Sequence, residues 1–299
     1  MRRLILSRKG FDSSAGGVPS PIFPDGRIIS LPIPDCRTNL QYKDINIWEY
    51  NLGEIVKDLT REKIPLDWKI HLDPDLNSKL KSERLSRSPD WRPIFGQVGA
   101  AQGHLKNQKV SVGDLFLFFG LFQEVELKYG HWVFRKDTKP KHLIWGWLQI
   151  DQILKVDDIV QDQLNWARYH PHFNRSEDKT NTLYISSRDL HFSSDSGKIM
   201  NGAGVFEHYS EHRQLTDLNS TSTLWKLPAW FFPEIGRSPL TYHSDISRWK
   251  LTTDAALLRS VSKGQEFVLQ LDHYPQLEVF SWLESVLQPT GFSDKSSNE

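Results

Sequence analysis

Cysteine is nearly absent from this chain of 299 residues, which contains one, Cys36. A single cysteine can form neither an intrachain disulfide nor a zinc site built from several cysteines, and this usage is typical of a reducing compartment. Long hydrophobic runs are also lacking: residues 115–122 form the longest, which is too short to cross a bilayer, and the first residues lack a signal-peptide pattern. We therefore expect a cytoplasmic protein without membrane contact.

The chain also lacks a net charge of either sign. Its 37 Lys and Arg residues balance its 37 Asp and Glu residues. This balance excludes the global positive field that drives non-specific DNA binding, so any contact with nucleic acid must come from a local patch. With 38% hydrophobic and 25% charged residues, the chain can bury one large core or two modest ones.

Tryptophan, in contrast, is abundant: there are 11, beside 16 phenylalanines and 8 tyrosines. Such side chains supply large buried areas, and they are also the ones on which bases and sugars stack. We expect most of them in the core and two or three in a pocket, and the sequence does not identify which.

The pattern of apolar residues predicts an α+β fold. Short aromatic and β-branched runs, separated by turn residues, predict strands between residues 110 and 150 and again between 180 and 206. Helical periodicity predicts helices over residues 44–59 and 276–287, the second with Leu277, Phe280, Leu283 and Leu287 on one face. We expect a mixed, mostly antiparallel β core with flanking helices and long functional loops. One domain over residues 1–290 and a disordered tail over 291–299 follow from the continuous pattern and the polar end.

The first candidate site lies at the N-terminus, where a predicted strand over residues 1–9 runs directly into a glycine-rich turn. Glycine permits close approach of another group and positive φ, so such a turn can present backbone amides and a carboxylate to a ligand. The segment is equally well interpreted as an ordinary surface loop that follows an edge strand. The candidate binding residues of this region are Arg8, Lys9, Phe11, Asp12, Ser13, Ser14 and Asp25.

The second candidate is a segment rich in small residues, 93–105, which we expect to be a binding loop. Gln97, Gln102 and His104 stand among three glycines and two alanines there, and amides with an imidazole can read the edge of a base. The spacing matches neither a P-loop nor a dinucleotide fingerprint. The alternative is a buried turn that packs against residues 113–115.

The third candidate contains Arg168, His170 and His172, with Pro171 between the histidines. In an extended chain the two imidazoles would point in opposed directions, so a shared metal would need another ligand from elsewhere and an unusual backbone. We therefore expect neither a metal nor another cofactor. A histidine beside Arg168 can instead protonate a leaving base or hold a phosphate.

The C-terminal third interleaves aromatic residues with basic ones, among them Lys226, Arg237 and Arg248. Stacking faces beside phosphate partners are what single-stranded or extruded nucleotides need. Glu266 stands in a strand-like run, where it is either an outward residue or a buried carboxylate with a partner.

Taken together, these segments resemble the third family of nucleotide modification associated domains, over nearly the whole chain. The family occurs in bacteria and phages and is associated with genes for DNA base hypermodification, so the resemblance implies work on modified bases in DNA or opposition to phages that carry them. The residues that carry the resemblance are 6–14, Gly16, Gly17, 19–21, 25–27, 95–105, 113–120, 170–172, 225–228 and 264–267.

We interpret the chain first as an N-glycosylase that excises a modified base from DNA. Asp12 would stabilise the oxocarbenium-like sugar or direct a water, and a protonated His104 or His170 would assist the departing base. Phe11 would form an aromatic wall, and Gln97 and Gln102 would read the flipped base. A non-catalytic reader, a base-modifying transferase and an enzyme on free nucleotides remain alternatives, and the oligomeric state stays open.

Overall fold

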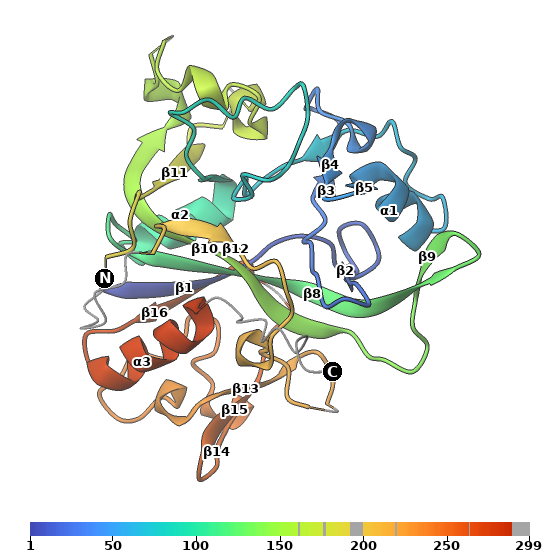
Figure 1. Ribbon diagram of the computed structural model, residues 1–299. Coiled ribbons are helices and arrows are strands. Elements are labelled where there is room, and N and C mark those ends of the chain that lie inside the picture. The colour runs from blue at the N-terminus through green and yellow to red at the C-terminus, as the bar shows by residue number, and fades with distance from the viewer. Residues whose placement is uncertain (161, 176–177, 192–199, 219, 263, 289–299) are drawn as a thin grey trace, which may run out of the picture.

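The computed structural model describes residues 1–160, 162–175, 178–191, 200–218, 220–262 and 264–288, so the predicted tail at 291–299 lies outside the described residues. Its centre is a nine-stranded sheet (Figure 1). Six strands follow one another across it: β16 (Glu266–Gln270), β1 (Arg3–Arg8), β8 (Leu115–Lys128), β10 (Lys141–Lys155), β11 (Thr182–Ser186) and β7 (Ile94–Gln97). The others pair with the two long strands: β2 (Ser20–Ile22) and β9 (His131–Phe134) with β8, and β12 (Ala203–Val205) with β10.

The sheet is mixed and largely antiparallel, as predicted. Only the pairings of β1 and β2 with β8 are parallel among the pairings of this sheet in the described residues. The long strands β8 and β10 account for the aromatic runs between residues 110 and 150, and β11 and β12 for the runs at 182–186 and 203–205. These strand predictions are confirmed.

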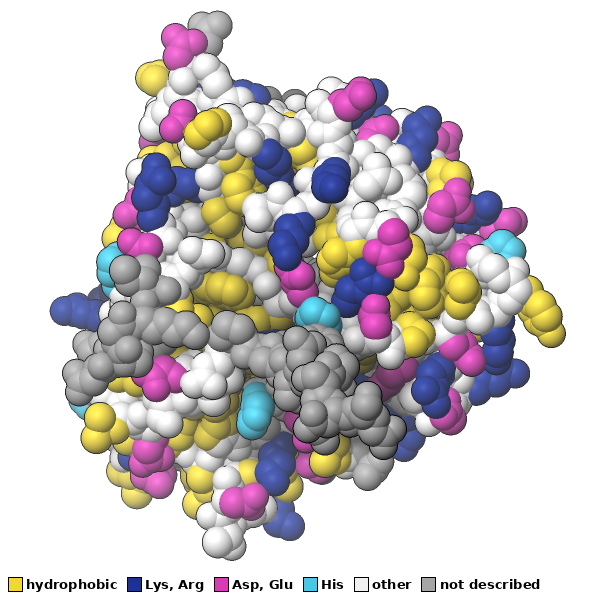
Figure 2. Space-filling view, in the orientation of Figure 1, with side chains coloured by type: hydrophobic (Ala, Val, Ile, Leu, Met, Phe, Trp, Pro, Cys, Tyr) yellow, Lys and Arg dark blue, Asp and Glu magenta, His cyan; other side chains and the backbone are white. Residues whose placement is uncertain are grey.

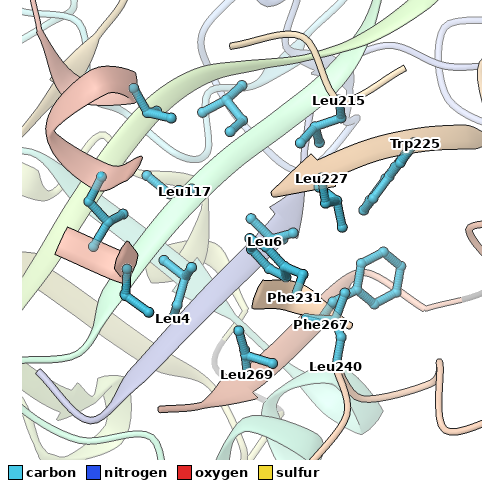
Figure 3. Close-up of a cluster of buried hydrophobic side chains, with 14 of the residues drawn as sticks. Leu4, Leu6, Leu117, Leu215, Trp225, Leu227, Phe231, Leu240, Phe267 and Leu269 are labelled. Carbon is cyan, nitrogen blue, oxygen red and sulfur yellow. The ribbon is translucent and has the colours of Figure 1, made fainter. Parts of the chain in front are cut away.

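The continuous apolar run of β8 arises because both faces of the sheet are covered. Leu115, Leu117 and Phe119 lie in one core cluster, and the alternate residues Phe116 and Phe118 lie in another. A strand buried on both faces needs apolar side chains at every position. Figure 3 shows the first cluster, in which side chains of β1, β8 and β16 meet those of the strand that carries Trp225 and Leu227.

The sheet curls until its two edge strands meet. Phe95 of β7 has its ring centroid 5.1 Å from that of Phe116 of β8, although two strands separate β7 from β8 in the sheet. At the end of β7, Gln97 Nε2 donates a hydrogen bond to Glu266 Oε1 at the start of β16, over 2.6 Å. The α2 helix (Gly99–Asn107) follows β7 and packs against β16. The six strands thus form a partly closed barrel whose edges meet at Gln97 and Glu266.

A second group of elements covers one side of the sheet with a core of its own. It contains the α1 helix, and in Figure 1 it lies above the extended ends of β8 and β9. The elements are β3 (Ile33–Pro34), the 3₁₀ helix η1 (Tyr42–Asp44), β4 (Asn46–Ile47), β5 (Tyr50–Asn51), α1 (Leu52–Leu59) and β6 (Ile70–His71).

The predicted helix over residues 44–59 is therefore wrong in its first half. Residues 46–51 form the β4–β5 hairpin, because Trp48 takes a left-handed conformation with φ of 52° that no α-helix contains. The helix begins at Leu52, after Asn51, whose side-chain oxygen accepts the Gly53 amide at 3.0 Å as an N-cap.

The opposite side of the sheet is covered by the α3 helix (Gln276–Leu287) and a small sheet of β13 (Leu224–Pro228), β15 (Ala255–Arg259) and β14 (Trp249–Leu251) (Figure 1). The predicted bounds of α3 are confirmed. Its predicted buried face is partly wrong: Leu277 is 87% exposed, and Val279 and Val286 are buried with Leu283 and Leu287. Short 3₁₀ helices connect other elements: η2 (Val156–Asp158), η3 (Asn165–Ala167), η4 (Pro171–Asn174), η5 (Glu211–Arg213), η6 (Ala229–Phe231) and η7 (Ile246–Arg248).

The loop expected at 93–105 is a strand followed by a helix, β7 and α2. Of its three glycines, only Gly96 is closely packed, against His172, whereas a Cβ at Gly99 or Gly103 would meet nothing within 4 Å. Ala100 and Ala101 of α2 line the cleft described below. Across the described residues, no helix is long and apolar enough to cross a membrane.

A buried histidine in the core makes the stability of this fold depend on pH. Trp225 Nε1 donates to His142 Nδ1 over 3.0 Å, and burial, together with the charge of Arg8, lowers the pKa of His142 to about 3. Because the unfolded chain binds this proton near pH 6.5 and the folded chain does not, stability is lost as the pH falls below 6.5. Between pH 7 and pH 5 this histidine removes about 2 kcal/mol from the free energy of unfolding.

We expect His142→Gln to reduce that acid-induced loss by about 2 kcal/mol in urea unfolding at the two pH values. The exposed residue His212 offers the matched control, since His212→Gln is expected to keep the wild-type dependence. An unchanged pH dependence in His142→Gln would contradict the assignment.

Candidate active site

A cleft of about 630 Å³ opens where β1 and β7 end and β16 begins. This volume is within the range of small-molecule sites, roughly 300–1,000 Å³. Most of its lining residues carry polar or charged side chains, and they come from parts of the chain that are far apart. The lining residues are Arg8, Lys9, Gly10, Asp12, Ser14, Ala15, Ile33, His71, Asp73, Gly96, Gln97, Val98, Ala100, Ala101, His104, His172, Arg175, Tyr242, Ser262, Gly264, Gln265 and Glu266.

Glu266 is a buried carboxylate at the seam of the barrel. Its Oε1 accepts hydrogen bonds from Lys9 Nζ at 2.8 Å and Gln97 Nε2 at 2.6 Å. The Glu266 side chain is 1% exposed, and its Oε2 has no hydrogen-bond partner in the described part of the chain. Of the two interpretations of Glu266, the buried carboxylate with a partner is confirmed. Lys9 also lies 4.8 Å from the centre of the Phe95 ring, so its charge is held in place on two sides.

The glycine-rich turn fixes the carboxylate of Asp12 at the cleft. Asp12 Oδ1 accepts the amides of Ser14 and Ala15, each at 2.8 Å, and the Ser14 hydroxyl at 2.7 Å. Gly16 has φ of 81°, and a Cβ there would lie 2.4 Å from the ring of Phe11. Glycine is therefore required at this position, both for its backbone and for its contact.

Phe11 is a core residue rather than a wall of the cleft. It is fully buried in the core of the α1 side, with its ring centroid 6.5 Å from that of Tyr42. The aromatic ring that lines the cleft is that of Tyr242, which is 49% exposed. Phe11 is buried because the glycine-rich turn folds over its ring, and the turn can do so because Gly16 has no Cβ to clash with that ring.

Arg8 binds the segment before β16 to the end of β1. Its guanidinium donates to the carbonyls of Val261 and Ser262 at 2.9 and 2.7 Å. Burial lowers the pKa of Arg8 while the nearby Asp12 charge opposes this shift. Arg8 thus holds one rim of the cleft in place.

Helix α2 supplies His104 to the cleft and turns Gln102 away from it. His104 Nε2 lies 3.1 Å from Thr241 Oγ1, and its ring is 4.7 Å from that of Tyr242. Burial lowers the pKa of His104, so this imidazole is neutral at pH 7 in the free protein. Gln102 is buried, and its side-chain oxygen accepts the Tyr184 hydroxyl at 2.8 Å.

The inner wall holds a buried group of His71, Asp73, His170 and His172, which we call the His–Asp cluster. Asp73 Oδ2 lies 3.7 Å from His71 Nε2 and 3.6 Å from His172 Nε2, and Asp73 Oδ1 lies 3.1 Å from His170 Nε2. Burial opposes ionisation of Asp73, but its interactions with the three histidines outweigh burial and hold its pKa well below the ordinary value. The cluster therefore keeps a buried negative charge beside the cleft.

The predicted site residues divide into two sets. Those that line the cleft are Arg8, Lys9, Asp12, Ser14, Gln97, His104 and His172. His170 lies behind them in the His–Asp cluster, and Ser13 is exposed on the turn.

Two other predicted binding residues are engaged elsewhere. Asp25 pairs with Arg27 at 2.5 Å, and Arg27 also pairs with Glu49. The Arg168 guanidinium donates to the carbonyls of Val160 and Gln163.

Several cleft residues escaped prediction: His71, Asp73, Arg175 and Tyr242. One signal was available, since residues i and i+2 of an extended chain point to the same side and His71 and Asp73 have this spacing. Nothing in the sequence joins this pair to His172, because the sheet, and not the spacing, brings them together.

Comparison with known protein families gives a match over most of the chain. The family model described as nucleotide modification associated domain 3 matches residues 3–270, a range that contains every residue of the cleft and ends before α3. No curated protein and no solved structure matches the chain. The chain therefore belongs to the nucleotide modification associated domain 3 family.

Proposed function

We propose that the cleft receives a modified base displaced from DNA and that the protein is an N-glycosylase that releases this base. The family associates the chain with nucleotide modification. The observation that carries the proposal is the convergence of two carboxylates, Asp12 and Glu266, with the imidazole of His104 in one polar cleft of about 630 Å³. Carboxylates beside a proton donor are the groups that cleavage of a glycosidic bond requires.

The reaction is hydrolysis of the bond between C1′ of the sugar and a ring nitrogen of the base. As this bond breaks, its electron pair passes to the base, and His104 in its protonated form donates a proton there. The carboxylate of Asp12 stabilises the positive charge that develops on the sugar. Water adds at C1′ and loses a proton to a carboxylate, which leaves the free base and an abasic site.

In this proposal Gln97 has a positioning role rather than the base-reading role expected from the sequence. Its Nε2 donates to Glu266, and its Oε1 accepts the Val98 amide at 3.0 Å, so both ends of the side-chain amide hold protein groups. Recognition of the base therefore rests on stacking against Tyr242, which is 49% exposed at the cleft. His170 contacts Asp73 rather than the cleft, so in this proposal it acts through Asp73.

Surface charge favours a small contact with DNA. In Figure 2 the basic side chains of the visible face are interspersed with acidic ones and gather into no single patch among the described residues. Together with the balance of 37 basic and 37 acidic residues in the whole chain, this leads us to expect that binding neutralises few phosphates, which gives a shallow dependence of affinity on salt.

The experiment is incubation of the purified protein with phage DNA that carries hypermodified cytosines and with unmodified DNA, followed by mass spectrometry of released bases and an abasic-site assay. We expect release of a modified base and matching abasic sites from the modified DNA alone. Tight retention of modified DNA without release would instead identify a reader, and release from free nucleotides but not from DNA would identify a nucleotide enzyme.

The proposed acid role of His104 predicts an acidic optimum. The donor must be protonated, and burial lowers the pKa of His104 below its ordinary 6.5, so activity is expected to fall as the pH rises through that lowered pKa. The measurement is kcat/KM for base release between pH 5 and pH 8. His104→Gln is expected to lose this dependence along with most activity, and a profile that stays the same in the variant would exclude the role.

A further inference from the structure

The His–Asp cluster has a geometry that the proposed hydrolysis does not use. We infer that His71, Asp73 and His172 bind a divalent transition-metal ion of the zinc or iron(II) class. The inference does not depend on the proposed glycosylase activity, because metal binding is measured without any nucleic acid.

The spacing of the three side chains suits an ion between them. Asp73 Oδ2 lies 3.7 Å from His71 Nε2 and 3.6 Å from His172 Nε2, and all three ligand atoms lie within 4.8 Å of one another. Two ligands at about 2.1 Å from a tetrahedral ion are about 3.4 Å apart. The observed nitrogen–oxygen separations are thus too long for hydrogen bonds and close to those of a coordination shell.

The partner of His71 orients its ring for coordination. His71 Nδ1 lies 2.8 Å from Asp35 Oδ2, so Nδ1 is the protonated nitrogen and donates to the carboxylate. In the neutral ring this leaves the lone pair on Nε2, which is the atom that faces Asp73. A carboxylate behind a ligating histidine is the usual support of a metal site.

His172 is oriented in the same way by Asn181. The Asn181 amide nitrogen donates to the carbonyls of His172 and Arg175 at 2.8 and 3.2 Å, which leaves its oxygen as an acceptor. That oxygen lies 2.6 Å from His172 Nδ1, so Nδ1 is the donor and Nε2 carries the lone pair. Both histidines therefore direct a lone pair toward Asp73 Oδ2.

Other groups complete the cradle. Asp73 Oδ1 accepts the Gly96 amide at 2.7 Å, which leaves Oδ2 for an ion. A Cβ at Gly96 would lie 2.3 Å from the His172 ring, so glycine is what allows this ring to reach the site.

A fourth imidazole, that of His170, lies beside these ligands. His170 is fully buried, and within the described residues neither of its ring nitrogens has an aligned hydrogen bond. Unsatisfied buried polar groups are rare, and a missing ion or water is a common reason for one. His170 Nε2 lies 3.1 Å from Asp73 Oδ1, the carboxylate oxygen that does not face His71 and His172, so His170 adjoins the proposed ion site without being one of its ligands.

Two imidazoles and one carboxylate beside an open cleft are typical ligands of zinc and of non-haem iron(II). His71, Asp73 and His172 all line the cleft, so remaining coordination positions face its volume. The sequence alone argued against a metal because it considered His170 and His172, and the ligands from residues 71 and 73 come from a different part of the chain.

The test is equilibrium binding of Zn²⁺, and separately of Fe²⁺ without oxygen, to the full chain after treatment with a chelator. We expect one ion per chain for at least one of the two metals. X-ray absorption of the loaded wild-type protein identifies the ligands, and we expect imidazole nitrogen and carboxylate oxygen. Absence of stoichiometric binding to both metals, or a shell of sulfur or of oxygen alone, would overturn the inference.

Metal binding by variants of the cluster tests whether the ion is bound there. We expect His172→Gln to weaken binding more than 100-fold. Asn181→Leu keeps the three ligands but removes the acceptor of the His172 ring and the hydrogen bonds to the carbonyls of His172 and Arg175, and we expect it to weaken binding about 10- to 100-fold. His131 provides the matched control because it also pairs with a carboxylate, Asp58, at 2.9 Å, but on the surface. His131→Gln should bind as the wild type does. Equal affinity in all variants that fold would overturn the assignment, and the wild-type ligand spectrum decides it if a variant does not fold.

Discussion

Asp12→Asn is expected to reduce base release by at least about 10²- to 10³-fold while DNA retention changes little. Asparagine keeps the oxygen that accepts the amides of Ser14 and Ala15 and the Ser14 hydroxyl, so the turn retains its shape. The substitution removes the negative charge that would stabilise the sugar cation. The measurements are single-turnover release of the modified base and binding of the same DNA, made on the same preparation.

Asp245 provides the matched control for this prediction. Its Oδ1 accepts the Ser247 amide at 3.0 Å in a similar turn, and it is exposed outside the cleft. Asp245→Asn should therefore release the base at the wild-type rate. If Asp12→Asn were as active as Asp245→Asn, Asp12 would have no catalytic part, and the proposal would have to move the charge stabilisation to Glu266.

Lys9→Met is expected to lower the free energy of unfolding by about 3–5 kcal/mol. The substitution leaves Glu266, whose side chain is 1% exposed, without the cation 2.8 Å away. Loss of one member of a buried ion pair costs far more than loss of both, because an uncompensated charge remains in a medium of low polarity. The double variant Lys9→Met and Glu266→Gln should therefore regain most of the lost stability. Urea unfolding of the wild type, both single variants and the double variant measures the coupling between the two residues.

The exposed pair of Lys226 and Asp254, with nitrogen and oxygen 3.0 Å apart, is the control for burial. Lys226→Met should change the free energy of unfolding by less than about 1 kcal/mol, since solvent screens such pairs. A cost for Lys9→Met no larger than that of Lys226→Met would show that the seam of the barrel does not depend on the ion pair.

Secondary structure was predictable where the pattern of apolar side chains within a single segment is enough to identify it as a strand or a helix. Residues 115–122 and 142–150 have no polar face because the sheet is covered on both sides, and this pattern predicts strands at any position in a fold. The α3 helix was predicted with its observed bounds for the same reason. Its buried face was not, because the surface against which a helix packs is a property of the neighbouring elements.

Predictions failed where a single backbone conformation overrides the periodicity. Trp48 with positive φ converts the start of a predicted helix into a hairpin, and the small residues of 93–105 belong to β7 and α2. Phe11 was expected to form an aromatic wall of the binding site, but the turn closes over its ring at Gly16 and buries it in the core.

The sequence by itself determined the family, the mixed and mostly antiparallel sheet, and the polar, glycine-rich turn that follows the first strand, because these follow from local pattern and from matched motifs over residues 3–270. Only the tertiary structure decided which polar groups share the cleft. Lys9, Gln97 and Glu266 meet because the sheet curls until its edges touch. His71 and Asp73 meet His172 beside Gly96 of β7, against which both Asp73 and His172 pack. The curvature of a sheet is set by packing on both of its faces. The contacts that produce it join residues far apart in the chain, so no local sequence pattern predicts them.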